Sequence, residues 1–157
     1  MKKAYLDTSA INVLLFSEYS QKDKERYPAV KEMFDKIDAG LLHVIVSLYA
    51  IQELFAFCKM TFSAERAGYI AREAFGELCK HQFELIGLLT RMERLLYKRN
   101  FILDDSTDQP HAIAAHIQNC EYFVTFDHGF GVLKNHFRVV TPAELLKDLD
   151  SPDESVR

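Results

Sequence analysis

Two aspartates stand directly at the ends of predicted strands, where their carboxylates could act together as ligands of a metal ion. Asp7 ends a strand predicted over Lys3–Asp7, and Asp127 follows a strand predicted over Tyr122–Phe126. Ligands of open α/β sheets bind beyond the carboxyl ends of the strands, and in a parallel sheet these ends share one edge. We therefore expect both carboxylates at the same edge of the sheet.

Two further acids are expected near this edge. Glu53 lies on the second turn of a helix predicted over Leu48–Met60, directly after a β-rich run at Leu42–Ser47. The helix around Glu53 is apolar, so its carboxylate must face solvent or have a charged partner. Asp108 begins the helix that leads into the strand at Tyr122. The four acids thus come from four separate segments that a parallel sheet would bring together.

Each acid also has a purely structural explanation. Asp7 could simply end its strand, and Glu53 could face solvent. Asp108 could complement a helix dipole, and Asp127 could form a turn. Four neighbouring carboxylates, however, repel one another and raise each other's pKa values, a conflict that a divalent cation removes. Magnesium prefers oxygen ligands, and a pair of such ions about 4 Å apart can activate a water and stabilise the leaving oxygen in phosphodiester cleavage.

Strands and helices alternate along the chain, which predicts an α/β fold with a mainly parallel central sheet flanked by helices. A further strand is predicted at Phe137–Thr141, the run Phe83–Ile86 is ambiguous, and Ser17–Tyr27 is predicted as a loop or a frayed helix end. Further helices are predicted at Thr8–Phe16, at Pro28–Asp38, from Ser63 through an apolar stripe at Ile70–Leu78, along a second stripe at Leu88–Leu96, at Asp108–Asn119 and after Pro142. Both stripes are expected to be mainly core, although part of them could serve an interface with another chain. Residues 1–149 are expected to form a single domain, with a polar and disordered tail at 150–157.

The composition is that of a globular protein. The 157 residues are 48% hydrophobic and 27% charged, with no apolar run long enough for a membrane span and no signal peptide, so a cytoplasmic location is expected. The three cysteines lack the spacing of a zinc site and argue against a disulfide framework. The net charge of −4 counts against a nucleic-acid binder, although two divalent ions at an acidic site would offset it.

The motifs of this chain resemble those of PIN domains, in the family's order and over nearly the whole length. The resemblance rests on Tyr5–Ile11, on Ile45–Ser47 with Gln52–Leu54, on Asp108–Ala115, on Phe123–Phe130 and on Val139–Pro142.

This resemblance implies an endoribonuclease that depends on Mg²⁺ or Mn²⁺. It makes Asp7, Glu53, Asp108 and Asp127 the metal-binding and catalytic acids, with Ser9 or Thr8, and Thr125, as hydroxyl helpers. Many small PIN proteins are VapC-like toxins that form homodimers and pair with an inhibitory antitoxin, so RNA, an antitoxin and a second copy of the chain are the implied partners. In one departure from the family pattern, Gly129 stands where many members carry a further acid.

Several alternatives accompany this interpretation. Asp105 could be a substitute ligand or support Asp108, and His111, His116 and His128 could assist the acids or be ordinary polar residues. A haloacid-dehalogenase-type phosphatase would need an aspartate at position 9, where Ser9 stands. A PIN-like module that binds RNA or protein without turnover is the other class of function. Basic residues near the site could hold phosphates, although most are expected to be solvated surface.

Overall fold

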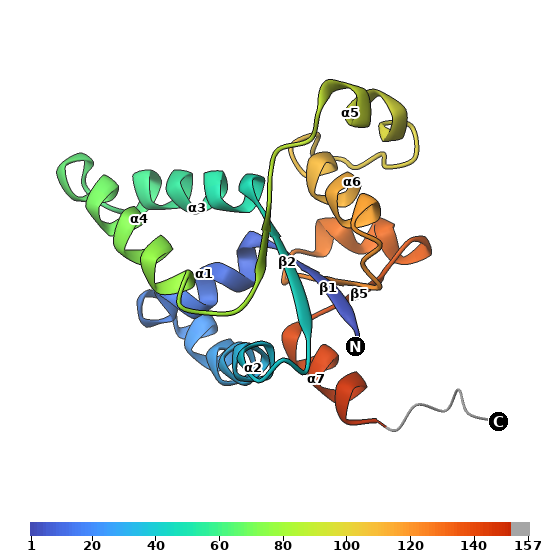
Figure 1. Ribbon diagram of the computed structural model, residues 1–157. Helices are drawn as coiled ribbons and strands as arrows, with labels where there is room; N and C mark the ends of the chain where they lie inside the picture. The colour runs from blue at the N-terminus through green and yellow to red at the C-terminus, as the bar shows by residue number, and fades with distance from the viewer. Residues whose placement is uncertain (152–157) are drawn as a thin grey trace.

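A five-stranded parallel sheet forms the centre of the molecule in the computed structural model, which describes residues 1–151 (Figure 1). The strands are β1 (Lys3–Leu6), β2 (His43–Ser47), β3 (Glu84–Ile86), β4 (Tyr122–Val124) and β5 (Arg138–Val140). Their order is β3-β2-β1-β4-β5, and all four neighbouring pairs are parallel. The predicted α/β class is confirmed, and the ambiguous run before Ile86 is an edge strand.

The order of the strands creates a switch point next to β1. The chain adds β2 and β3 on one side of β1 and then adds β4 and β5 on the other side. A crevice opens between the carboxyl ends of the strands where the direction of winding reverses. The residues that follow β1 and β4 are therefore the ones that the topology exposes to a ligand.

Helices cover both faces of the sheet because successive strand residues point to opposite sides. Ala4 and Leu6 of β1 pack against one layer and Tyr5 packs against the other. The first layer consists of α1 (Thr8–Phe16), α2 (Gln21–Asp38) and α7 (Pro142–Asp150), and the second consists of α6 (Gln109–Ile117) and the 3₁₀ helix η2 (His128–Asn135).

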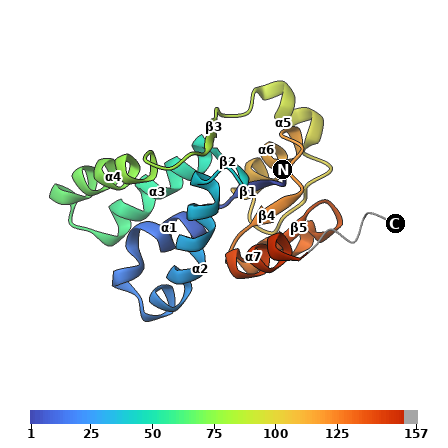
Figure 2. The same cartoon turned by 60° about the horizontal axis from the view of Figure 1, so that its bottom comes forward.

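Two further helices form an arm beside these layers, and one short helix lies at the opposite side. The arm consists of α3 (Leu48–Thr61) and α4 (Ala64–Leu78), which pack together and against Phe16. The short helix α5 (Arg91–Tyr97) contacts α6. Figures 1 and 2 show α4 and α5 on opposite sides of the molecule. No helix within residues 1–151 is long and apolar enough to span a bilayer.

The prediction of a loop at Ser17–Tyr27 was wrong. A short 3₁₀ helix, η1 (Ser17–Tyr19), is followed by α2, which begins at Gln21 and carries Pro28 in its interior. Ser20 caps α2 by accepting a hydrogen bond from the Asp23 N–H at 3.4 Å. Pro28 lies on the exposed side of the helix, where water can hydrate the carbonyl group that loses its backbone partner. Proline therefore does not mark the start of this helix.

The two apolar stripes have opposite environments. The stripe Ile70–Leu78 is core, as predicted, with Ala71 and Leu78 at 1% and 0% exposure. The stripe Leu88–Leu96 was wrongly assigned to the core, because Met92 and Leu96 are 71% and 64% exposed. Helix α5 has no buried residue, since it lies outside α6 rather than against the sheet.

The short helix predicted after Pro142 is present. It is α7, which ends at Asp150. Most of the tail predicted at 150–157 lies outside the described residues, which end at Ser151.

Candidate functional site

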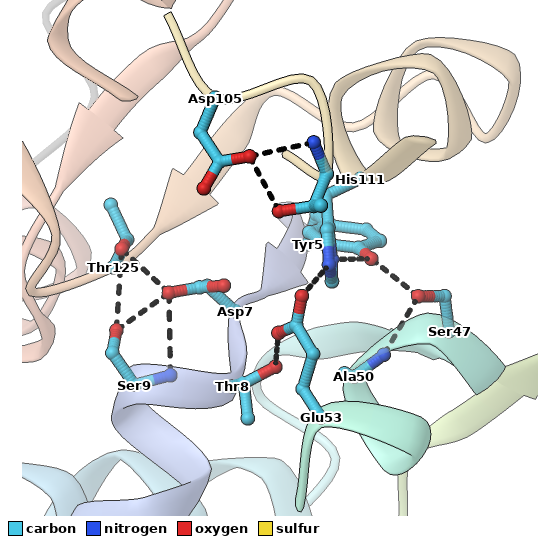
Figure 3. A network of polar contacts seen from close by, with 11 residues as sticks. Tyr5, Asp7, Thr8, Ser9, Ser47, Ala50, Glu53, Asp105, His111 and Thr125 are labelled. Carbon is cyan, nitrogen blue, oxygen red and sulfur yellow. Dashed lines mark hydrogen bonds and ion pairs between the residues drawn. The ribbon is translucent and has the colours of Figure 1, made fainter. Parts of the chain in front are cut away.

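Asp7 is held at the switch point by the segments that follow β1 and β4. Its N–H continues the ladder by donating to the carbonyl group of Val124 at 3.0 Å. One carboxylate oxygen, Oδ2, accepts hydrogen bonds from the hydroxyl groups of Ser9 at 2.6 Å and Thr125 at 2.8 Å, and from the Ser9 N–H at 3.3 Å. The other oxygen accepts no hydrogen bond from the described residues and points toward Glu53 and His111 (Figure 3).

The environment of Asp7 leaves its negative charge incompletely compensated. The residue is only 4% exposed, and this burial raises the pKa of its carboxyl group, although the hydrogen bonds from Ser9 and Thr125 oppose the shift. The side chain is thus oriented by three donors through one oxygen while the second oxygen is left for a ligand. A cation at this second oxygen would supply the missing compensation.

Glu53 lies beside Asp7, and both of its oxygens are in use. Helix α3 starts at the end of β2, where Ser47 accepts a hydrogen bond from the Ala50 N–H at 3.4 Å, and this start sets the direction of the helix. Glu53 Oε2 accepts a hydrogen bond from the Thr8 hydroxyl group, and Oε1 lies 2.8 Å from His111 Nε2. Burial alone would raise the pKa of Glu53, but His111 and Thr8 outweigh this effect and lower it. The carboxylate is therefore ionised and held in one orientation.

His111 is fully buried and links Glu53 to the sheet. Its Nδ1 lies 2.8 Å from the Tyr5 hydroxyl group, which in turn lies 2.5 Å from Ser47 Oγ. Because an ionised carboxylate can only accept, Nε2 carries the proton in the contact with Glu53. Burial would lower the pKa of His111, but the hydrogen bond and charge of Glu53 raise it. The chain Ser47–Tyr5–His111 (Figure 3) thus fixes the Glu53 carboxylate from β1, β2 and α6.

Asp7, Glu53 and His111 form a compact group that could hold a metal ion. One potential ligand atom from each of the three residues lies within 4.8 Å of the others. A ring nitrogen and carboxylate oxygens are suitable ligands for several divalent metals, whereas magnesium prefers the oxygens alone. Since His111 already bonds Glu53 through Nε2 and Tyr5 through Nδ1, we expect the carboxylates to be the ligands.

Asp108 and Asp127 lie together at Gly129, outside that compact group. A Cβ atom placed on Gly129 would lie 3.2 Å from Asp127 Oδ1 and 3.9 Å from Asp108 Oδ2. Asp127 is exposed, and its Oδ1 accepts a hydrogen bond from the Gly129 N–H at 2.8 Å, so it does form a turn. Gly129, the departure from the PIN pattern, therefore leaves room between two of the predicted acids.

Asp108 has a strongly raised pKa. It precedes α6, yet its side chain caps no backbone N–H of that helix. Burial and the charges of Asp105, Asp127 and Asp7 raise the pKa of Asp108 from 3.8 to about 6. Neighbouring carboxylates without a counterion have this effect on one another. Asp108 is thus an uncompensated acid that faces the other acids of the set.

Asp105 has a different environment, although it is only three residues away. It is exposed, and its Oδ1 accepts hydrogen bonds from the Thr107 N–H at 2.8 Å and from the Thr107 hydroxyl group at 2.7 Å. These two bonds lower the pKa of Asp105. Its carboxylate therefore stabilises its own loop, and it contributes to the site mainly through its charge.

This chain is similar to known proteins in structure but not in sequence. No protein-family model matches the sequence, and no curated protein gives a significant match. The structure is similar to that of FitAcB from Neisseria gonorrhoeae, with a TM-score of 0.59, 15% identity and coverage of 88% of this chain and 97% of that chain. It is also similar to VapBC2 from Rickettsia felis bound to a promoter DNA fragment, with a TM-score of 0.57, 15% identity and coverage of 87% and 96%. The chain has a PIN-like fold.

The PIN-like fold puts every predicted site residue near the switch point. It brings Asp7 and Glu53 within reach of each other, and it gathers Asp108 and Asp127 around Gly129. The hydroxyl groups of the predicted helpers all contact a predicted acid: Ser9 and Thr125 contact Asp7, and Thr8 contacts Glu53.

His111 has a larger part in the site than the sequence motifs indicated. The signal in the sequence was a pair of polar residues in apolar helices, Glu53 in α3 and His111 beside the alanines of α6. An acid in such an apolar helix must face solvent or have a charged partner, and a buried histidine needs hydrogen-bonding partners. Only the packing of α6 against β1 and α3 shows that these two residues satisfy each other.

Proposed function

We propose that this chain is a divalent-metal-dependent endoribonuclease. The observation that carries the proposal is the set of uncompensated carboxylates at the switch point. Asp7 is buried with one oxygen unbonded among the described residues, and Asp108 has a pKa raised to about 6 by burial and by its acidic neighbours. Acids gathered in this way favour a cation strongly, and perturbed pKa values that have a clear physical cause are typical of functional sites.

Asp7, Glu53, Asp108 and Asp127 would hold Mg²⁺ or Mn²⁺. The bound metal would activate a water molecule and stabilise the leaving oxygen of the phosphodiester. Ser9 and Thr125 orient Asp7, whereas Thr8 and His111 orient Glu53. Residues that orient metal ligands in this way usually affect metal affinity or activity by about 10-fold to 100-fold when they are replaced.

Metal dependence on a closed RNA substrate tests this proposal. Wild-type protein with Mg²⁺ or Mn²⁺ is expected to open a circular single-stranded RNA, because an endonuclease needs no free end. A chelator is expected to stop the reaction, and excess metal is expected to restore it, as the acids alone cannot replace the cation. Gel electrophoresis measures the linear product.

Two results would contradict the nuclease proposal. Cleavage that continues in the chelator would point to a metal-independent contaminant. RNA binding without any cleavage in Mg²⁺ or Mn²⁺ would instead favour the binding module without turnover.

We further propose that the protein acts in the cytoplasm as the toxin of a toxin–antitoxin pair and forms a homodimer. The motif resemblance to VapC-like toxins and the structural similarity to VapBC2 support the pairing. The exposed Met92 and Leu96 of α5 offer apolar surface for an interface with another chain. Light scattering is expected to give twice the chain mass of 18.1 kDa, and expression in the host is expected to arrest growth. A monomer together with harmless overexpression would contradict this pair of expectations.

A further inference from the structure

Two neighbouring hollows share Arg94 in their walls, and they lie between the acidic site and a basic surface. The first has a volume of about 450 Å³ and is lined by Tyr49, Glu53, Arg94 and Thr107, among others. The second has a volume of about 390 Å³ and is lined by residues of α5 and its flanking segments. Since Arg94 lines both, the two hollows are neighbours, one next to Glu53 and the other along α5. Each volume lies in the range that holds a small molecule or a single group of a larger ligand.

The second hollow is basic. Arg91, Arg94 and Lys98 line it at helical spacings of three and four residues, so the three side chains share one face of α5. None of the three forms a salt bridge with a carboxylate in the part of the chain that the structure describes. By contrast, Lys31 and Arg138 have acidic partners at 2.7 Å. In a chain of net charge −4, three free cations beside an acidic site form a strong local asymmetry.

The walls of both hollows also offer surfaces for bases. Tyr49 lines the first hollow, and its hydroxyl group accepts a hydrogen bond from the Leu89 N–H at 3.1 Å, which holds the tyrosine in place. Leu89 and Leu95 line the second hollow beside the cations. Aromatic and apolar side chains that alternate with arginine and lysine are typical of grooves that bind single-stranded nucleic acid, because each nucleotide has both a flat base and a charged phosphate.

We infer that the two hollows form the substrate tract, in which single-stranded RNA next to the cleaved phosphate runs from Glu53 past Tyr49 onto Arg94, Lys98 and Arg91. This inference rests on the proposed nuclease function and names the residues that bind its substrate. A separate duplex is a poorer fit, because proteins recognise double-stranded RNA by its shape over many base pairs rather than within small hollows.

RNA binding in a chelator tests the tract without requiring catalysis. The double variant Arg94→Gln/Lys98→Gln is expected to bind a short single-stranded RNA about 10-fold or more weakly than wild type, with a slope of log affinity against log salt that is smaller by about 1.4, since each phosphate contact contributes about 0.7. Fluorescence anisotropy gives both quantities. The single variant Arg91→Gln provides an independent measurement on the same helix face.

The matched control is Arg66→Gln/Arg72→Gln on α4, at the opposite side of the molecule (Figure 2). It removes the same charge from exposed arginines and is expected to bind RNA like wild type. Thermal unfolding monitors the fold of all variants, and α5 has no buried residue to lose.

Three outcomes would overturn the inference. The α5 double variant could bind RNA as tightly as wild type, or the two double variants could lose affinity equally. The α5 double variant could also lose as much affinity for a blunt-ended RNA duplex as for single-stranded RNA, which would mean that Arg94 and Lys98 provide only general electrostatic attraction. A wild-type protein that binds RNA through α5 but cuts nothing would refute the nuclease proposal while leaving the tract standing, so the two failures are distinguishable.

Discussion

Asp7→Asn is expected to lower RNA cleavage by about 10³-fold while the protein keeps its fold. Metal ions contribute several kcal/mol to transition-state stabilisation, and about 1.4 kcal/mol corresponds to a factor of ten in rate. Asparagine keeps the shape of the side chain and can still accept hydrogen bonds from Ser9 and Thr125 through its carbonyl oxygen. It lacks the charge that a cation requires. Initial rates on the circular RNA in Mg²⁺ and Mn²⁺ measure the effect.

The stability of this variant provides a second readout. Burial raises the pKa of Asp7, so the folded protein holds this proton more strongly than the unfolded chain does. The resulting stabilisation is present at low pH and is lost as pH rises through the raised pKa. At pH 7 in a chelator, which is above the ordinary pKa of an aspartate, burying Asp7 costs folding free energy. Asp7→Asn is therefore expected to unfold at the same temperature as wild type or a higher one.

Asp35→Asn is the matched control for Asp7→Asn. Asp35 lies on α2 and forms an exposed salt bridge with Lys31, so its loss should change neither cleavage nor stability appreciably. Equal cleavage by wild type and Asp7→Asn would refute the metal site and point to a contaminant. A large loss of stability in Asp7→Asn would show that the carboxylate is structural.

Asp108→Asn is expected to lower the rate of RNA cleavage by about 10²-fold to 10³-fold, whereas Asp105→Asn should cleave RNA at nearly the wild-type rate. The two residues differ in whether their carboxylate oxygens accept hydrogen bonds from the protein. Asp108 caps no helix N–H and has a pKa raised to about 6, so its charge is uncompensated. Asp105 is exposed and bonded to Thr107, and its replacement mainly loosens a loop. Single-turnover rates of the two variants provide the comparison.

The pH dependence of stability separates these two acids independently of cleavage. Because the pKa of Asp108 rises from 3.8 to about 6, metal-free wild type should lose stability as pH increases through this interval. Asp108→Asn should flatten that part of the profile. The pKa of Asp105 is lowered, so this carboxylate contributes stability above its ordinary pKa that is lost in acid. If Asp105→Asn abolishes cleavage and Asp108→Asn cuts normally, the assignment is wrong by one helical turn.

Local patterns were sufficient to predict the sheet and the position of the acids along it. The alternation of short β-rich runs with helical stripes requires crossover connections, and these make neighbouring strands parallel. Residues that follow such strands must then lie at one edge. Asp7 and Asp127 could therefore be placed on the same edge before any contact was known, and the pairing of β1 with β4 confirms this placement.

The spacing of apolar residues did not distinguish a buried helix from an exposed one. The Leu88–Leu96 stripe and the Ile70–Leu78 stripe have similar apolar spacing, yet the first is mostly exposed and the second is buried. Periodicity shows that a helix has an apolar face, but it does not show whether another element covers that face. Likewise, Pro28 is typical of a helix start, and only its exposed position inside α2 explains why the helix tolerates it.

The sequence by itself determined the fold class, the position of Asp7 and Asp127 at the same edge of the sheet, and the need of Glu53 for a partner, although β4 ends at Val124 and not at the predicted Phe126. The tertiary structure decided that the partner is His111, that Thr8 holds the other Glu53 oxygen, and that Asp105 is bonded within its own loop. The physical reason is the range of the interactions. Strand and helix periodicity is a property of neighbouring residues, whereas the contact between Glu53 and His111 joins residues 58 positions apart and exists only when α3 and α6 meet at the same strand ends.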